Sequence, residues 1–258
     1  MTTLSALVVV HNEEDILAAC LERLAFADEL VVVLDKCTDG SRDIALRFTD
    51  AAHLVEGSWE VEGPRRNAGL DACCGDWVVE VDADEHVPAA LAEEIRAAIE
   101  TSAADYHDLP VDNYVGGHRV RYGWGASFGT SAVPRLSRKG AKRWGEQRVH
   151  PALVWRGRGG AKAVKGPTLA NRLDHYVDDS ISDMLRRLDR YSSARARDLR
   201  ESGNIGSLAN NVRRFFSRFY KCYIGRKGYR EGGWGFLIAL CAGLYPLLSY
   251  LKARLEDA

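Results

Sequence analysis

The sequence predicts an α/β protein with a mostly parallel sheet flanked by helices, followed by a helical appendage. Over residues 4–100, short apolar runs rich in Val alternate with helical patterns, which is typical of βα units. Hydrophobic residues make up 46% of the chain and charged residues 28%, with only 7 Pro, so a disordered or collagen-like chain is excluded. A length of 258 residues favours one main domain with an appendage.

The elements of the first part of the chain follow from periodicity. Each expected strand is a short apolar run, and a stretch with a helical pattern lies between successive strands. Pro88 fits the first turn of the last of these helices, where a missing N–H costs nothing. We expect strands at 4–10, 30–34, 52–55 and 77–81, and helices at 13–25, 41–48, 64–72 and 88–100.

The chain changes character after residue 105. It becomes rich in Gly and Arg, as at 115–118 and 155–160, and we expect loops there that build a site. Ser180 then begins a capping box, and apolar residues recur at helical spacing after it. A long amphipathic helix is therefore expected to end near Glu201.

The last fifty residues predict membrane association. Residues 213–230 contain seven basic and six aromatic residues and no acid, as in a helix lying on an anionic membrane. The uncharged run 232–251 would span about 30 Å as a helix. Because its glycines and Pro246 weaken a straight helix, we expect a re-entrant or in-plane hairpin rather than a full span, with a buried core helix as the remaining alternative. Nucleic acid binding would not explain the uncharged run, so no nucleic acid partner is expected.

Charge divides the chain into two halves. Residues 1–112 contain 7 Lys and Arg against 25 Asp and Glu, and residues 113–258 contain 28 against 11. An acidic half suits a divalent cation, and a basic, aromatic half suits phosphates, anionic lipid or nucleic acid. Attraction between the halves is the alternative explanation.

Cysteine spacing and the start of the chain bear on location. The six Cys show no metal-ligand spacing, so we expect reduced thiols. No basic region or cleavage site accompanies the first apolar run. We therefore expect no secretory signal and a cytoplasmic location.

The strongest chemical signal is an Asp-x-Asp, formed by Asp82 and Asp84, at the end of the fourth expected strand. Open α/β sheets bind ligands in the crevice beyond the carboxyl ends of their strands. Mg²⁺ or Mn²⁺ usually binds there through one or two carboxylates plus substrate phosphates, which indicates a metal–diphosphate site. Acidic residues before a helix can also simply complement its dipole. An EF-hand is excluded because the motif has no glycine at the sixth position.

Three further segments accompany this motif, at 8–14, 31–41 and 63–69. Together and in this order, over about residues 4–100, they resemble the inverting family 2 glycosyltransferases with a GT-A fold, most closely the lipopolysaccharide-core β-1,4-glucosyltransferases. The resemblance implies a nucleotide-sugar-binding half at 1–112, an acceptor-side half of the same catalytic domain at 113–205, and a membrane-associating segment at 206–258.

The resemblance also implies roles for residues of the first half. Asp35 would accept a hydrogen bond from the N3–H of a pyrimidine base, and the Arg66 guanidinium would bind the diphosphate. A solvated Arg is the alternative for Arg66. The other matching residues are Asn12 and Glu13 at the donor nucleoside, Asp82 at the ribose or the metal, and Asp84 as the ligand of Mg²⁺ or Mn²⁺.

The catalytic base must come from the second half, where acids are few. Glu146 lies in a loop-like stretch roughly where the family places its acceptor-side acid, and we expect it to be the base. The related glucosyltransferases often show an acid directly after Val-His, where this chain has Pro151. His150 and His175 could bind metal, phosphate or acceptor, or serve as structural hydrogen-bonding groups.

The expected function is a metal-dependent inverting transfer of a hexose from a UDP-sugar, such as UDP-glucose, to a lipid-linked or lipopolysaccharide-core acceptor. The enzyme would be peripheral or monotopic at the cytoplasmic face of the inner membrane and contact it through residues 210–251. One alternative is a non-catalytic, membrane-associated module that binds nucleotide-sugars. Another is a metal-dependent phosphatase or nucleotidyltransferase, although phosphatases with a nucleophilic Asp-x-Asp place it after the first strand.

Overall fold

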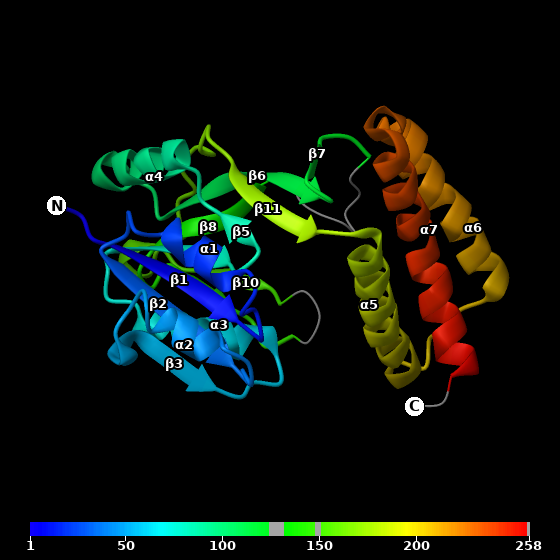
Figure 1. Cartoon of the computed structure of the whole chain (residues 1–258), viewed down its shortest axis with the longest axis horizontal. Coiled ribbons are helices and arrows are strands. Elements are labelled where there is room, and N and C mark those ends of the chain that lie inside the picture. The colour runs from blue at the N-terminus through cyan, green and yellow to red at the C-terminus, as the bar shows by residue number, and fades with distance from the viewer. Residues whose placement is uncertain (124–131, 148–150, 257–258) are drawn as a thin grey trace. The chain divides into compact units, whose positions relative to one another are not determined.

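The computed structural model describes residues 1–123, 132–147 and 151–256 and contains a mixed α/β core (Figure 1). The strands are β1 Leu4–Val10, β2 Glu29–Asp35, β3 Leu54–Gly57, β4 Trp77–Asp82, β5 Glu85–His86, β6 Tyr106–Val115, β7 His118–Val120, β8 Ala132–Arg138, β9 Lys142–Trp144, β10 Leu153–Trp155 and β11 Leu173–Asp178. The longer helices are α1 Leu17–Glu22, α2 Ser41–Ala45, α3 Glu62–Ala72, α4 Ala89–Thr101, α5 Ile181–Glu201, α6 Leu208–Tyr220 and α7 Gly232–Leu255.

Nine strands form one sheet in the order β3-β2-β1-β4-β8-β6-β11-β5, with β7 paired to β6. The four strands predicted from the first hundred residues are its parallel part, and β8 joins β4 in the antiparallel direction. This arrangement confirms the predicted α/β class and brings the carboxyl ends of β1, β2 and β4 to the same edge of the sheet.

Alternation along the central strands explains why helices cover both faces. In β1, Ala6, Val8 and Val10 pack with the apolar sides of α1 and α4. Leu7 lies between Ala6 and Val8 in the strand, points to the opposite face and packs with Leu70 of α3. Successive side chains of a strand point to opposite faces, so a strand with apolar residues on both faces requires cover on both sides.

The chain divides into two compact units that differ from the predicted three-part division. The first comprises residues 1–111 and 132–175, and the second comprises 112–131 and 176–258. Residues of the expected acceptor-side part thus fall in both units, and α5 belongs with α6 and α7. All six cysteines are free thiols.

The second unit is built around α5, α6 and α7, which lie side by side (Figure 1). The predicted cap of α5 is confirmed, because Ser180 Oγ accepts a hydrogen bond of 3.1 Å from Asp183 N. Gly228–Leu255 is the one stretch of the described chain long and apolar enough to cross a membrane, and 44% of its most apolar window is buried.

The expected hairpin at 232–251 is wrong, because α7 is a single continuous helix through the buried Pro246. A Cβ at Gly243 would lie 2.9 Å from the backbone oxygen and ring of Phe215 in α6. A Cβ at Gly235 would lie 1.8 Å from Gly228 O. Glycines in this helix therefore permit close packing of neighbouring segments.

The expectation of loops after residue 105 is correct for residues 116–117 and 156–160, which form turns, but wrong for much of the rest, since the described residues between 106 and 178 include the strands β6 to β11. Polar residues hide the alternation of β6, in which His107 and Asn113 are buried on the same face as Leu109 and Val111. The predicted helix 13–25 is shorter than expected, at Leu17–Glu22.

Candidate functional site

The Asp-x-Asp motif lies where the sequence placed it, at the carboxyl end of β4, and its first carboxylate is paired with two guanidinium groups. Asp82 Oδ1 accepts a hydrogen bond of 2.8 Å from Arg66 Nη2 of α3, and Oδ2 accepts one from Arg135 Nη2 of β8. Burial alone would raise the pKa of Asp82, but Arg135 and Arg66 outweigh it and hold this pKa well below its usual range. Asp82 is therefore an anion that fixes two arginines.

Glu85 extends this cluster. Its Oε1 accepts a hydrogen bond of 2.8 Å from Arg135 Nη2, and its Oε2 accepts one of 2.8 Å from the backbone N–H of Asp82. Burial raises the pKa of Glu85, and the Asp82 carboxylate adds to the shift although Arg135 opposes it. These bonds hold the turn between β4 and β5 in one conformation.

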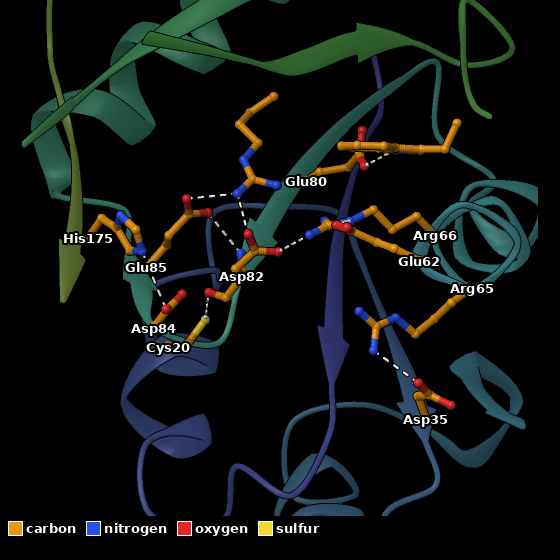
Figure 2. A network of polar contacts seen from close by, with 12 residues as sticks. Cys20, Asp35, Glu62, Arg65, Arg66, Glu80, Asp82, Asp84, Glu85 and His175 are labelled. Carbon is orange, nitrogen blue, oxygen red and sulfur yellow. Dashed lines mark hydrogen bonds and ion pairs between the residues drawn. The ribbon is translucent and has the colours of Figure 1, made fainter. Parts of the chain in front are cut away.

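The second carboxylate of the motif has a different partner. Asp84 Oδ2 lies 3.3 Å from His175 Nε2, with the two side chains 39% and 25% exposed. Antiparallel pairing of β5 with β11 sets Glu85 opposite His175 and so brings the histidine beside the motif. Figure 2 shows the His175 ring joined to Asp84, whereas Asp82 is joined to Arg66.

Asp84 and His175 fit a divalent cation. A partly exposed carboxylate oxygen and an imidazole nitrogen converge at the ligand-binding edge of the sheet. No group of three or more His, Cys, Asp or Glu residues able to hold a metal occurs in the described parts of the chain. One carboxylate, here that of Asp84, suffices for Mg²⁺ or Mn²⁺ when substrate phosphates complete the coordination shell, and His175 lies beside it.

Asp35 ends β2 at the same edge. Its Oδ1 accepts a hydrogen bond of 3.0 Å from the backbone N–H of Trp59, and its Oδ2 accepts one of 2.9 Å from Arg65 Nη1 (Figure 2). An ionised carboxylate has about four lone-pair positions. Asp35 can therefore still accept from a ligand N–H.

The segment after β1 is tied to the segment after β2. Asn12 has a φ of 55°, a conformation that asparagine tolerates better than most residues, and its Oδ1 accepts a hydrogen bond of 2.8 Å from Thr38 N. The backbone N–H of Glu13 donates to Ser41 Oγ at 3.0 Å. These bonds fix two of the sequence motifs against each other beside Asp35.

Helix α3 positions Glu146, which is exposed. Asn67 of α3 bonds the backbone of Trp144 twice, accepting from its N–H at 3.0 Å and donating to its carbonyl oxygen at 2.8 Å. A Cβ on Gly63 would lie 1.8 Å from Gly145 O, so only glycine permits this approach. The segment that carries Glu146 is thus held against the helix that carries Arg66.

The structure brings together residues that sequence reasoning chose and residues that it missed. Asp35 and Asp82 end β2 and β4, Asp84 follows β4 directly, and Arg66 reaches Asp82 from within α3 (Figure 2). Arg65, Glu85 and Arg135 were missed. Arg65 and Glu85 directly adjoin chosen motifs, but Arg135 carries no local signal because only the pairing of β8 with β4 brings it to Asp82. His150 lies outside the described residues.

Comparison with known proteins gives a family match over more than half of the chain. The sequence model for "Glycosyl transferase family 2" matches residues 5–153. The lipopolysaccharide core biosynthesis glycosyltransferase LpsC of Rhizobium meliloti (strain 1021) is 26% identical over 271 aligned residues, which cover 96% of this chain and 91% of LpsC.

Two solved structures resemble the fold. The crystal structure of S. aureus TarS is 17% identical, with a TM-score of 0.49, over 73% of this chain and 39% of TarS. Glucosyl-3-phosphoglycerate synthase from Mycobacterium tuberculosis, crystallised with Mg²⁺ and UDP, is 20% identical with a TM-score of 0.35 over 44% of each chain.

Proposed function

The chain belongs to glycosyltransferase family 2, and from this premise we propose that it transfers a hexose from a UDP-sugar, such as UDP-glucose, to a lipid-linked or lipopolysaccharide-core acceptor. The observation that carries the proposal is the cluster formed by Asp35, Arg66, Asp82 and Asp84 at one edge of the sheet. It combines an acceptor for a base N–H, guanidinium groups for phosphates and a carboxylate for a cation.

Each of these residues has a separate role in binding the donor. Asp35 accepts from the uracil N3–H, and Asn12 and Glu13 border the nucleoside. Arg66 neutralises the diphosphate, and Asp82 keeps that guanidinium in place through their 2.8 Å hydrogen bond. Asp84, with His175, would hold Mg²⁺ or Mn²⁺, and the cation would supply Lewis-acid stabilisation of the charge that develops on the leaving UDP.

Transfer proceeds by a single displacement. The Glu146 carboxylate takes the proton of the acceptor hydroxyl, whose oxygen attacks the anomeric carbon from the face opposite UDP. The new C–O bond forms as the bond from the anomeric carbon to the phosphate oxygen breaks, and UDP leaves with the electron pair. The configuration at the anomeric carbon is therefore inverted.

The second unit supports binding at the cytoplasmic face of a membrane. Five exposed apolar residues recur at every fourth position along α6 and the turn that follows it, a set that we call the α6 stripe: Leu208, Val212, Phe216, Tyr220 and Ile224. Exposed basic residues, including Arg213, Arg214 and Lys221, lie on the same helix or beside it. Apolar side chains next to cations match the acyl boundary and headgroups of an anionic leaflet.

The relative named for lipopolysaccharide core biosynthesis supports the acceptor class, since it aligns with nearly the whole chain. Such an acceptor is anchored in a membrane, which agrees with the α6 stripe. Because α7 is packed among other helices, we propose peripheral rather than spanning attachment.

The donor site is tested by calorimetric titration of UDP, with and without Mn²⁺, into the wild-type protein, Asp84→Ala and a control, Asp50→Ala. Asp50 is an exposed aspartate that precedes a short helix at 51–53. We expect Mn²⁺-dependent binding in the wild type and the control, and a loss of about a hundredfold in Asp84→Ala, as for removal of a key metal ligand or its support.

Equal UDP affinity in Asp84→Ala and wild type would refute the metal role of Asp84. UDP binding without transfer to any lipid-linked acceptor would instead support a non-catalytic binding module.

A further inference from the structure

A buried polar cluster lies on the α3 side of the sheet, next to the donor site. The side chains of Glu80 and Lys142 are each 1% exposed, and 2.6 Å separates Glu80 Oε1 from Lys142 Nζ. Glu80 Oε2 accepts a hydrogen bond of 3.0 Å from the indole N–H of Trp144. Lys142 Nζ also donates to Pro134 O at 2.8 Å and lies 4.6 Å from the centroid of the Trp144 ring. The cluster fixes both the position and the orientation of the indole.

Stability alone does not explain this cluster. Desolvation offsets most of the attraction within a buried ion pair, and apolar residues of similar volume often stabilise a core as well or better. The neighbours of Glu80 in β4, Val79 and Val81, are apolar and buried. The presence of a buried charged pair in this apolar strand is better explained by the side chain that the pair positions.

The indole that the cluster holds is in contact with the donor side of the site. The guanidinium carbon of Arg66 lies 4.9 Å from the centroid of the Trp144 ring, a distance at which a cation is attracted to an aromatic face. The same guanidinium donates to Asp82. Trp144 thus supports the arginine that we assign to the diphosphate.

Trp144 is also connected to the acceptor side of the proposed site. Trp144 ends β9, and Gly145 and Glu146 follow it directly. Asn67 bonds the backbone N–H and carbonyl of Trp144. A shift of the indole would therefore move Arg66, which packs on the ring. It would also move Glu146, which follows Trp144 by two residues in the chain.

We propose that Glu80, Lys142 and Trp144 are positioning residues that align the diphosphate-binding arginine with the catalytic base. This inference rests on the proposed function, because it assumes the roles of Arg66 and Glu146. Glu80 and Lys142 anchor the indole, the ring supports Arg66, and the segment after Trp144 places Glu146.

Two substitutions of Trp144 separate these effects. Trp144→Phe keeps a ring beside Arg66 but removes the N–H that bonds Glu80, so we expect the UDP Kd to stay within about threefold of wild type, while kcat for transfer falls about tenfold or more. Trp144→Leu also removes the ring, so the UDP Kd should rise about tenfold as well. A purely structural role would not separate Kd from kcat in this way.

The ion pair is tested by the double variant Glu80→Leu/Lys142→Met. Since both charges are replaced together, no buried charge loses its partner, and its melting temperature should fall less than that of Glu80→Leu alone, whereas kcat should fall about tenfold because the indole loses its acceptor. The matched control is Asp71→Asn, which removes an exposed ion pair to Arg143 between the same two elements, α3 and β9. It should transfer at the wild-type rate.

Wild-type kcat in Trp144→Phe or in the double variant would overturn the inference while leaving the proposed function intact. Failure of the wild-type protein to bind UDP or any other nucleotide-sugar donor would overturn both.

Discussion

Two aspartates separated by one residue have different chemistry because their neighbours differ. Asp82 lies between Arg66 and Arg135, which hold its pKa below the usual range despite burial. Asp84 is 39% exposed and lies beside His175. The first is suited to organising cations of the protein, and the second to binding a cation from solution.

Glu146→Gln tests the assignment of the base. The amide cannot accept the proton of the acceptor hydroxyl, so kcat should fall about a hundredfold or more, while UDP binding should stay unchanged because the amide has the size of the carboxylate and Glu146 is assigned to the acceptor rather than to the donor. Steady-state transfer assays and calorimetry measure the two quantities. Glu22→Gln, an exposed residue at the end of α1, serves as control. Unchanged kcat would show that another acid is the base.

At the scale of elements, contacts between short segments position the site residues more than the long helices do. The two-residue strand β5 aligns His175 with the Asp-x-Asp. A close approach of Gly63 in α3 to Gly145 places the Glu146 segment. Each contact joins residues more than eighty positions apart in the chain, and neither has a periodic pattern that would reveal it.

Gly63→Ala should separate α3 from the segment after β9. The added Cβ would lie 1.8 Å from Gly145 O, and backbone must move to relieve that clash. We expect a lower melting temperature and a kcat for transfer reduced about tenfold or more, on the scale of a misplaced catalytic group.

The control is Gly233→Ala, at a helical glycine with nothing within 4 Å of the added Cβ, which should be neutral or slightly stabilising. Equal behaviour of the two variants in thermal melts and transfer assays would contradict the role of Gly63.

At the scale of the whole molecule, the residues proposed for catalysis and those proposed for membrane contact lie in different units. The residues proposed to bind the metal and the donor all lie in the first unit, and the α6 stripe lies in the second. Deleting the tail is a poor test of membrane binding, because α7 contributes Ile238 and Cys241 to a core shared with Met184 of α5. Point substitutions on the exposed face keep that core.

The variant Phe216→Ser/Tyr220→Ser removes two apolar side chains from the α6 stripe, each 63% exposed. It should sediment less with vesicles of phosphatidylglycerol and phosphatidylcholine than the wild type does, and binding of both should weaken as salt screens the basic residues. Tyr191→Ser, at an exposed position of α5, should bind as the wild type. Equal sedimentation of all three proteins would place the membrane contact elsewhere.

The sequence by itself determined the parallel part of the sheet, the position of the Asp-x-Asp after β4 and the cap of α5. These features depend on local patterns: a strand apolar on both faces, a helix with period 3.6, and a serine three residues before an acid. Family membership followed from the same motifs, because their order along the chain is itself a sequence property.

Only the tertiary structure decided which residues surround those motifs. Arg135 and His175 reach Asp82 and Asp84 through strand pairings, and such pairing leaves no local signature because the partners are distant in the chain. The sequence left undecided, for a related reason, whether α7 lies in a membrane or in a protein core. An uncharged twenty-residue run has the same composition in a bilayer as inside a helical unit, and only its packing against α5 and α6 shows that this helix is part of a protein core.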